Sequence, residues 1–277
     1  MERKPLGSSG VMVPEIGLGT WRYTGGPEPL RRGIELGANL IDTAEMYRTE
    51  DAVGEAIAGI RDQVFVATKV LGSNLRYDAV LRAADRSLRL LAVDKIDLYQ
   101  VHWPNPRVPI AETMRAMARL VDDGLVDYVG VSNFSVEDMA EAQAAMPHHP
   151  IVSNQILYNL RRRRAERDVI PYCRQHDIAV IAYSPLHEGA LTGNGGGVAS
   201  GVRRALGMNR DRQVLADLAG ETGKTPVQVA LNWVADQPGV IAIPKSNSVA
   251  RTEENCAASG WSLTPDQRQR LDAVFPV

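Results

Sequence analysis

Four side chains in the first part of the chain carry groups suited to proton transfer: Asp42, Tyr47, Lys69 and His102. Asp42, Lys69 and His102 each stand at the end of a short apolar run, and Tyr47 follows Asp42 by five residues. Runs of this length and composition are typical of β-strands. Three consecutive strand ends would therefore carry a carboxylate, an ammonium and an imidazole, with a phenol close by. Such groups serve as general acids and bases when they meet at one site.

The segments that would position these side chains form a regular alternation of apolar runs and amphipathic stretches. The expected strands cover residues 15–20, 39–42, 63–69, 96–102, 126–132, 151–155, 178–183 and 240–243. The expected helices cover residues 29–38, 49–60, 77–91, 111–123, 136–146, 165–176, 212–221, 249–257 and 265–274. Residues 4–13 precede them and predict a small β-hairpin, because the run Gly7-Ser8-Ser9-Gly10 is rich in turn-forming residues.

Eight strands that alternate with helices, without a break in composition, predict an α/β fold of the (β/α)8 TIM-barrel type with an N-terminal β-hairpin. We expect a single domain over residues 1–277, because such a barrel needs roughly 250 residues. In these barrels the active site lies at the C-terminal ends of the strands, which is where Asp42, Lys69 and His102 are expected.

The alternative architecture is a doubly wound open sheet that binds a dinucleotide at a glycine-rich turn after its first strand. Gly17 and Gly19 stand at that place in the chain, but Thr20, Trp21 and Arg22 follow them. The third glycine of the fingerprint is therefore missing, which argues against this alternative.

The composition is that of an ordinary globular protein, with 44% hydrophobic and 23% charged residues. A net charge of −2 provides no basic field for nucleic acid or an anionic membrane. We interpret the one basic run, Arg161 to Arg164, as the solvated start of a helix beside Glu166 and Asp168. No apolar stretch approaches the roughly 18 residues of a membrane span, so we expect no membrane association. The net charge likewise leads us to expect no nucleic-acid partner.

The two cysteines, Cys173 and Cys256, are too few for a disulfide framework or a zinc site. The N-terminus leads into no apolar signal-peptide core. These features favour the cytoplasm, and we also expect a monomer that needs no metal. One connection, residues 185–210, is unusually long and holds four glycines within residues 193–197. It is expected either to fold over a ligand or to be a permissive surface insertion.

The chain resembles the aldo-keto reductase superfamily, and the likeness runs nearly from end to end. It rests on motifs that follow one another in order: Gly17-Leu18-Gly19-Thr20-Trp21, Asp42-Thr43-Ala44-Glu45-Met46-Tyr47, Ala67-Thr68-Lys69, Asp97-Leu98-Tyr99-Gln100-Val101-His102-Trp103, Gly130-Val131-Ser132-Asn133-Phe134, Asn154-Gln155, Tyr183-Ser184-Pro185-Leu186, Ile243-Pro244-Lys245-Ser246, Arg251 and Glu254-Asn255. Each motif alone is weak, but together at compatible spacings they are very specific.

The resemblance implies NADPH-dependent reduction of aldehydes and ketones to alcohols, with Asp42, Tyr47, Lys69 and His102 as a catalytic tetrad. Hydride delivery to a carbonyl places negative charge on its oxygen, which then needs a proton donor. We expect Lys69 to lower the pKa of the Tyr47 phenol, and Asp42 to keep Lys69 charged and oriented. His102 would donate a hydrogen bond to the carbonyl of a small-molecule substrate.

The resemblance also implies a cofactor site that runs along the later strand ends. Ser132, Asn133 and Gln155 are expected to hold the nicotinamide amide, and Tyr183 to stack on the nicotinamide ring. The remaining expected contacts are Ser184 and Leu186 along the pyrophosphate, Lys245, Ser246 and Arg251 at a 2′-phosphate, and Glu254 and Asn255 at the adenine.

Trp21, Trp103 and Tyr23 are expected to form the apolar walls of the substrate pocket. Arg48 departs from the family pattern, because a glycine often follows the tyrosine there. Family members that enclose bulky hydrophobic substrates carry a longer C-terminal tail. This chain stops soon after its last expected helix, which argues against steroid-sized substrates. The alternative function is a cofactor-binding regulatory subunit like those of potassium channels. It is disfavoured because such a role calls for an added N-terminal region or a partner surface.

Overall fold

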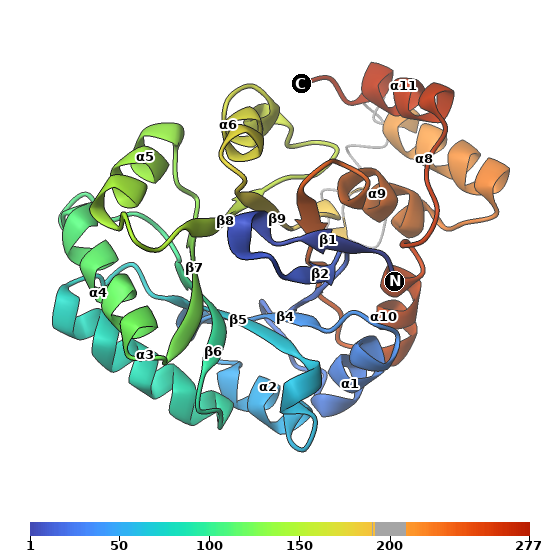
Figure 1. The fold of residues 1–277 in the computed structure, drawn as a ribbon. Coiled ribbons are helices and arrows are strands. Elements are labelled where there is room, and N and C mark those ends of the chain that lie inside the picture. The colour runs from blue at the N-terminus through green and yellow to red at the C-terminus, as the bar shows by residue number, and fades with distance from the viewer. Residues whose placement is uncertain (190, 192–208) are drawn as a thin grey trace.

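The computed structural model describes residues 1–189, 191 and 209–277. Eight parallel strands form one curled sheet in which neighbours along the chain are also neighbours in space (Figure 1). Their bounds are β3 Leu18–Gly19, β4 Leu40–Asp42, β5 Phe65–Val70, β6 Ile96–Val101, β7 Val126–Ser132, β8 Ile151–Leu157, β9 Ala179–Tyr183 and β10 Val240–Ala242. The expected strands are thus present, although the first is regular over only two residues.

The first and last strands meet and close the sheet into a barrel. Gly17 N donates to the Ala242 carbonyl at 2.8 Å, and Gly19 N donates to the Pro244 carbonyl at 3.0 Å. Parallel bridges also pair Ile16 with Ala242 and Gly19 with Lys245. The expected (β/α)8 barrel is therefore confirmed. Gly19 is needed at this seam, because a Cβ there would lie 2.7 Å from the Ile243 carbonyl oxygen.

The expected N-terminal hairpin is also confirmed, and it covers the end of the barrel opposite the C-terminal strand ends. Strand β1 (Arg3–Pro5) pairs antiparallel with β2 (Met12–Pro14), and the hairpin lies across the barrel in Figure 1. Leu6 and Val13 are completely buried there. They join an inner cluster with Leu40, Ala67, Leu98, Val152, Ala179, Ile181, Ile241 and Ile243.

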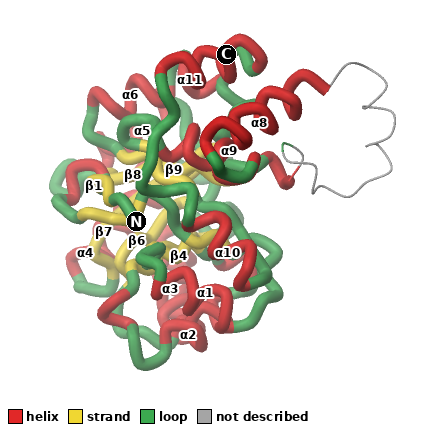
Figure 2. Tube along the Cα trace, turned by 90° about the vertical axis from the view of Figure 1, so that its right-hand side faces the viewer, coloured by secondary structure: helices red, strands yellow, loops and turns green. Residues whose placement is uncertain are grey.

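The helices pack around the outside of the sheet, as Figures 1 and 2 show. Their bounds are α1 Pro27–Glu35, α2 Glu50–Ile57, α3 Tyr77–Leu91, α4 Ile110–Asp122, α5 Val136–Ala145, α6 Val169–Gln175, α8 Asn209–Thr222, α9 Pro226–Ala235, α10 Val249–Cys256 and α11 Pro265–Val274. In α3 the buried residues Val80, Ala84 and Leu91 lie on one side, as an amphipathic pattern predicts.

Helix α9 was not expected from the sequence. Eight of its ten residues are buried, so it shows no alternation of apolar and polar faces. A start signal is nevertheless present: Thr225 and Gln228 form a reciprocal capping box around Pro226 at the first turn. That signal, rather than hydrophobic periodicity, could have revealed the helix.

The expected helix over residues 165–176 was wrong in its first turn. Arg164–Glu166 form a separate 3₁₀ turn, and α6 begins only at Val169. The basic run is likewise not simply solvated, because the Arg163 side chain is only 9% exposed. Its guanidinium binds both carboxylate oxygens of Glu166 at 2.8 and 3.0 Å, and the Phe275 carbonyl at 2.7 Å. These contacts hold the chain near its C-terminal helix instead of continuing α6.

Most of the long connection over residues 185–210 lies outside the described residues. Among the helices of the described part, none is long and apolar enough to cross a membrane.

Candidate active site

The four side chains singled out in the sequence meet at the C-terminal end of the barrel, around the ammonium of Lys69. Lys69 Nζ donates to Asp42 Oδ1 at 2.7 Å, to the Thr43 carbonyl at 2.8 Å and to Tyr47 Oη at 3.4 Å. The rings of Tyr47 and His102 lie edge to face with their centroids 5.4 Å apart. The sequence prediction that these residues form one site is therefore consistent with the fold.

Strand register explains how Asp42 and Lys69 come to face each other. Asp42 pairs with Ala67 across β4 and β5, and side chains alternate between the two faces of a strand. Lys69 is two residues beyond Ala67, so it points to the same interior face, one step nearer the barrel mouth. His102 follows β6 directly, and its backbone N–H donates to the Val70 carbonyl at 3.2 Å.

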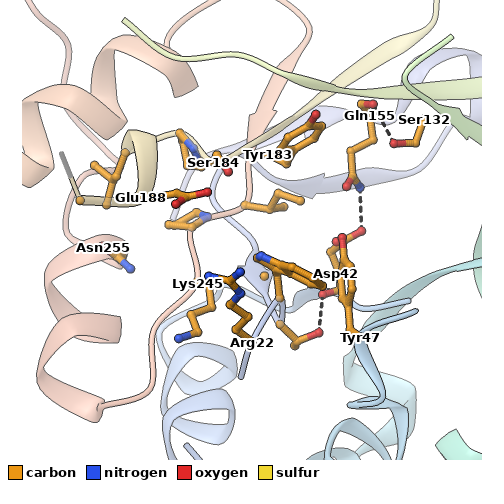
Figure 3. Close-up of a pocket in the computed structure, with 18 of the residues that line it drawn as sticks. Arg22, Asp42, Tyr47, Ser132, Gln155, Tyr183, Ser184, Glu188, Lys245 and Asn255 are labelled. Carbon is orange, nitrogen blue, oxygen red and sulfur yellow. Dashed lines mark hydrogen bonds between the residues drawn. The ribbon is translucent and has the colours of Figure 1, made fainter. Parts of the chain in front are cut away.

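Asp42 and Lys69 form a buried ion pair, with side chains 3% and 0% exposed. Burial alone would lower the pKa of Lys69, but the Asp42 carboxylate, helped by Tyr47, raises it. The second carboxylate oxygen, Asp42 Oδ2, accepts hydrogen bonds from Gln155 Nε2 at 2.7 Å and Gln100 Nε2 at 3.4 Å (Figure 3 shows the Gln155 contact). A buried charge pair is stable only when its remaining polar atoms are bonded in this way.

The expected lowering of the Tyr47 pKa is not the net result. Burial raises the pKa of the phenol, and the attraction of the Lys69 ammonium only partly opposes that shift. Tyr47 therefore holds its proton at neutral pH, while the ammonium lies beside the oxygen where a phenolate charge would form. A site with these two properties favours proton donation only when a strong acceptor is present.

His102 is held in its neutral form. Burial, with a further contribution from the Lys69 charge, lowers the pKa of His102 to about 3. Its Nδ1 atom is buried, and no hydrogen-bond partner for it is found among the described residues. The tautomer that leaves Nδ1 without a proton costs less, because an N–H group buried there would have no acceptor. This tautomer places the proton on Nε2.

These groups lie in a cavity of about 580 Å³ at the barrel mouth. Of the residues expected at the site, those that line it are Trp21, Asp42, Tyr47, His102, Trp103, Ser132, Asn133, Gln155, Tyr183, Ser184, Leu186, Lys245, Arg251, Glu254 and Asn255. Lys69 is not in this lining, because it is fully buried beside Asp42 and Tyr47.

Besides Lys69, two expected residues, Ser246 and Tyr23, do not line the cavity. The Ser246 hydroxyl donates to the Ser248 carbonyl at 2.9 Å and accepts from Ser248 N at 3.2 Å, in the turn before α10. The Tyr23 ring is buried, and its hydroxyl donates to the Gly26 carbonyl. Trp21 and Trp103, by contrast, are 42% and 46% exposed at the mouth, and Met46 joins them there.

One wall of the cavity is a chain of hydrogen bonds across β7, β8 and β9. The Ser132 hydroxyl donates to the Gln155 carbonyl at 2.9 Å, and the Tyr183 hydroxyl donates to Asn133 Oδ1 at 3.0 Å. Asn133 Nδ2 donates to Ser132 Oγ at 2.9 Å. Asn133 and Ser184 both have positive φ, at 62° and 50°. Strained backbone of this kind after the ends of strands, here β7 and β9, is typical of ligand sites.

The far end of the cavity is positively charged. Lys245 and Arg251 line the cavity, and Arg22, a residue that sequence reasoning missed, joins them. Figure 3 shows Arg22 and Lys245 close together. The Lys245 pKa is lowered by burial and by the charges of Arg251 and Arg22, and no carboxylate opposes this shift. In the described part of the chain, neither Lys245 nor Arg251 forms an ion pair. A cluster of cations without counter-ions fits an anionic group such as a phosphate.

Gln100 and Glu188 are further residues that the sequence analysis did not assign. Glu188 lines the cavity with a positive φ of 54°, in the turn after β9. Within the described residues, no group of three His, Cys, Asp or Glu side chains is arranged to hold a metal ion.

Comparisons with known proteins agree with this geometry. Residues 15–275 match the model of the "Aldo/keto reductase family". Methylglyoxal reductase YeaE of Escherichia coli (strain K12) is 36% identical over 288 residues, which covers 100% of this chain and 96% of that protein. Solved structures that resemble the chain include two that are each 35% identical to it. The thermostable aldo-keto reductase Tm1743, in complex with epalrestat, has a TM-score of 0.87 and covers 99% of this chain and 100% of that one. The aldo/keto reductase from Klebsiella pneumoniae, in complex with NADP and acetate, has a TM-score of 0.86 and covers 100% and 96%.

Proposed function

This chain belongs to the aldo/keto reductase family, and from that premise we propose that it reduces small aldehydes and ketones to alcohols with NADPH. One observation carries the proposal: the Lys69 ammonium contacts both the Asp42 carboxylate and the Tyr47 phenol beside a cavity with a cationic far end. We further propose that residues 1–277 act as one catalytic domain, in the cytoplasm.

Tyr47 is the proposed proton donor. Bound NADPH would supply a hydride to the carbonyl carbon, so the substrate oxygen gains negative charge and needs a proton. Tyr47 gives up its phenolic proton, and Lys69 stabilises the phenolate through the 3.4 Å contact between Nζ and Oη. Asp42 keeps Lys69 charged and aimed at the phenol. Neutral His102 donates a hydrogen bond from Nε2 and orients the carbonyl.

The cofactor assignments follow the two ends of the cavity. Asn133, Ser132 and Gln155 lie where a carboxamide would need polar partners, and Tyr183 offers a ring face beside them. Because Gln155 Nε2 is bonded to Asp42, its Oε1 is the atom left to accept from a carboxamide NH2 group. Lys245 and Arg251 suit the 2′-phosphate, Ser184 and Leu186 the pyrophosphate, and Glu254 and Asn255 the adenine. The Klebsiella pneumoniae relative was crystallised with NADP.

Small carbonyl compounds, including dicarbonyls, are the proposed substrates. The mouth of the cavity is lined by the large side chains of Trp21, Met46 and Trp103, which restrict the space beside Tyr47 and His102. The ring centroids of Trp21 and Tyr47 are only 5.0 Å apart. One relative of this chain is named a methylglyoxal reductase.

The test is Tyr47→Phe, assayed by loss of nicotinamide absorbance with methylglyoxal, simple aldehydes and ketones. The wild type should reduce members of this panel. The variant should lose at least about 100-fold in kcat, because general acid catalysis contributes about that much or more, while NADPH still binds. Tyr128→Phe is the matched control, since Tyr128 stacks on Phe65 outside the cavity. Full kcat in Tyr47→Phe, or no turnover by the wild type, would contradict the proposal.

A further inference from the structure

Tyr47 does not belong to a barrel strand, which makes its position beside Lys69 a separate structural problem. It ends a 3₁₀ turn, Glu45–Tyr47, in the connection between β4 and α2, whereas Lys69 lies within β5. The residue after it, Arg48, has a positive φ of 56°. The distance between the phenol and the ammonium therefore depends on how this connection is attached to β5.

Glu45, two residues before Tyr47, makes the first attachment between this connection and the chain after β5. Glu45 is 9% exposed, and both of its carboxylate oxygens bind the segment that follows β5. Oε2 accepts from the backbone N–H of Leu71 at 2.9 Å, and Oε1 accepts from Asn74 Nδ2 at 2.8 Å. Leu71 is two residues beyond Lys69, so Glu45 joins the turn of the phenol to the chain just past the ammonium.

Glu50, three residues after Tyr47, makes the second attachment, to β5. Glu50, the first residue of α2, is 1% exposed, and Thr68 is completely buried. The Thr68 hydroxyl donates to Glu50 Oε1 at 2.6 Å. Thr68 directly precedes Lys69 on β5 and points to the opposite face, toward the helices. Glu50 thus joins the other side of the phenol turn to the residue before the ammonium.

The connection is also attached to β4 at a third point. The buried Thr49 hydroxyl lies 3.0 Å from the hydroxyls of both Thr20 and Thr43. Thr43 in turn accepts from Lys69 through its carbonyl. The backbone before and after Tyr47 is therefore fixed to the strands that carry Asp42 and Lys69.

We propose that Glu45 and Glu50 are positioning residues, which hold the Tyr47 phenol against Lys69 through their bonds to Leu71, Asn74 and Thr68. This role rests on the proposed function of Tyr47. Neither carboxylate lines the cavity, so neither is expected to touch substrate or cofactor. Two buried carboxylates are costly to maintain, and apolar side chains of similar size would fill the space without fixing the turn. Charge-assisted hydrogen bonds are short and directional, which suits them to fix a turn in one position.

The main test is Thr68→Val, which keeps the shape of the side chain and removes the donor to Glu50. We expect kcat to fall about 10- to 100-fold, since a shift of about 1 Å in a reacting group has an effect of this size. KM and the NADPH dissociation constant should stay within about twofold, because the cavity lining is untouched. Thr113→Val is the matched control: Thr113 is 3% exposed, and its hydroxyl donates to the Leu75 carbonyl outside the phenol turn.

A second readout does not depend on turnover. The pKa of Tyr47 can be followed with tyrosine labelled at Cζ, with Tyr47→Phe to assign its resonance. Thr68→Val should raise the Tyr47 pKa above the wild-type value, because the phenolate loses the nearby ammonium. Glu50→Gln should keep kcat and the Tyr47 pKa closer to their wild-type values than Glu50→Ala does, since the amide oxygen can still accept from Thr68. Asn74→Ala, at a less buried position, should change kcat and the Tyr47 pKa in the same direction as Thr68→Val.

Three results would overturn the proposal. One is an unchanged kcat and an unchanged Tyr47 pKa in both Thr68→Val and Asn74→Ala. Another is an equal loss in Thr113→Val, which would indicate general loosening of the barrel. The third is an equal change in kcat and in the Tyr47 pKa in Glu50→Gln and Glu50→Ala. If the wild type reduced no carbonyl compound, the proposed function would fail, and the Cζ titration would still decide whether these carboxylates position Tyr47.

Discussion

At the scale of single residues, the site is organised around one fully bonded carboxylate. Asp42 uses one oxygen for Lys69 and the other for Gln155 and Gln100, so the ion pair is oriented from two sides. Gln155 comes from β8, where the nicotinamide amide is proposed to bind. A single amide side chain thus connects the proposed cofactor site to the ion pair behind the phenol.

The neutral state of His102 predicts the pH dependence of catalysis and of stability. With a pKa of about 3, His102 stays neutral above pH 5, so kcat should show no histidine inflection near pH 6.5. Unfolded chains protonate this histidine below about pH 6.5 and the folded protein does not, so its presence lowers stability as the pH falls. Urea unfolding at pH 7 and pH 5 should show His102→Gln gaining stability relative to the wild type at pH 5. An unchanged difference between the two proteins would contradict the neutral assignment.

Arg251 is expected to discriminate NADPH from NADH. A charge-assisted hydrogen bond contributes about 1.5–3 kcal/mol, and the exposure of Arg251 favours the lower end. Arg251→Ala should therefore weaken NADPH binding about tenfold at low salt and NADH binding hardly at all. Fluorescence titration of both cofactors measures this, with Arg82→Ala, an exposed position on α3, as control. Equal weakening of the two cofactors would mean that Arg251 does not recognise the phosphate.

At the scale of elements, the barrel strands pack so closely that Gly130, like Gly19, leaves no room for even a methyl group. Gly130 of β7 lies between β6 and β8, opposite Gln100 and Ser153. A Cβ there would lie 2.4 Å from Ser153 Oγ and 3.0 Å from Gln100 Cγ. Gly220 of α8 is the opposite case, since nothing lies within 4 Å of the equivalent atom.

These two glycines make a matched pair of substitutions. Gly130→Ala should destabilise the fold by about 1–3 kcal/mol through overpacking, and should lower kcat because Gln100 must shift near Asp42. Gly220→Ala should be neutral or stabilise the fold by up to about 1 kcal/mol, since alanine favours a helix more than glycine does. Chemical denaturation and steady-state kinetics measure both effects. Similar stability changes in the two variants would show that close packing around Gly130 is not the cause of the destabilisation.

At the scale of the whole molecule, the N-terminal hairpin completes the barrel core from the end opposite the site. Leu6 and Val13 fill the space inside the strands, and they pack in one cluster with Leu40, Leu98 and Ile241. Lys4 adds a polar attachment by donating to the carbonyls of Ala235, Gln237 and Val240. The hairpin therefore holds together segments that are more than two hundred residues apart in sequence.

Leu6→Ala should cost about 2–5 kcal/mol, because it leaves a cavity among rigid strands that cannot collapse into it. Met12→Ala, in the same hairpin, should change stability by less than about 0.5 kcal/mol, since Met12 is 46% exposed. The free energy of unfolding, measured in urea, distinguishes the two. A small loss in Leu6→Ala would mean that the hairpin adds little to the core.

The sequence by itself determined the strands and the barrel, because these depend on local patterns, and the family resemblance of its motifs indicated the residues of the proposed tetrad. Apolar runs, strand ends and the spacing from Asp42 to Tyr47 can be read without knowing what packs against them. Helix α9 escaped this reasoning, because it is buried on nearly every side and shows no amphipathic period.

Only the tertiary structure decided which residues distant in the sequence contact each other, and how burial and nearby charges shift their pKa values. Barrel closure brings Gly19 beside Lys245, and this places Arg22 among the cations at the far end of the cavity. Curvature of the sheet turns Gln155 toward Asp42, although the two are 113 residues apart. Burial raised the pKa of Tyr47 against the effect of Lys69, and depressed that of His102. Desolvation and contacts across the barrel depend on the packing of the whole chain, which no short stretch of sequence contains.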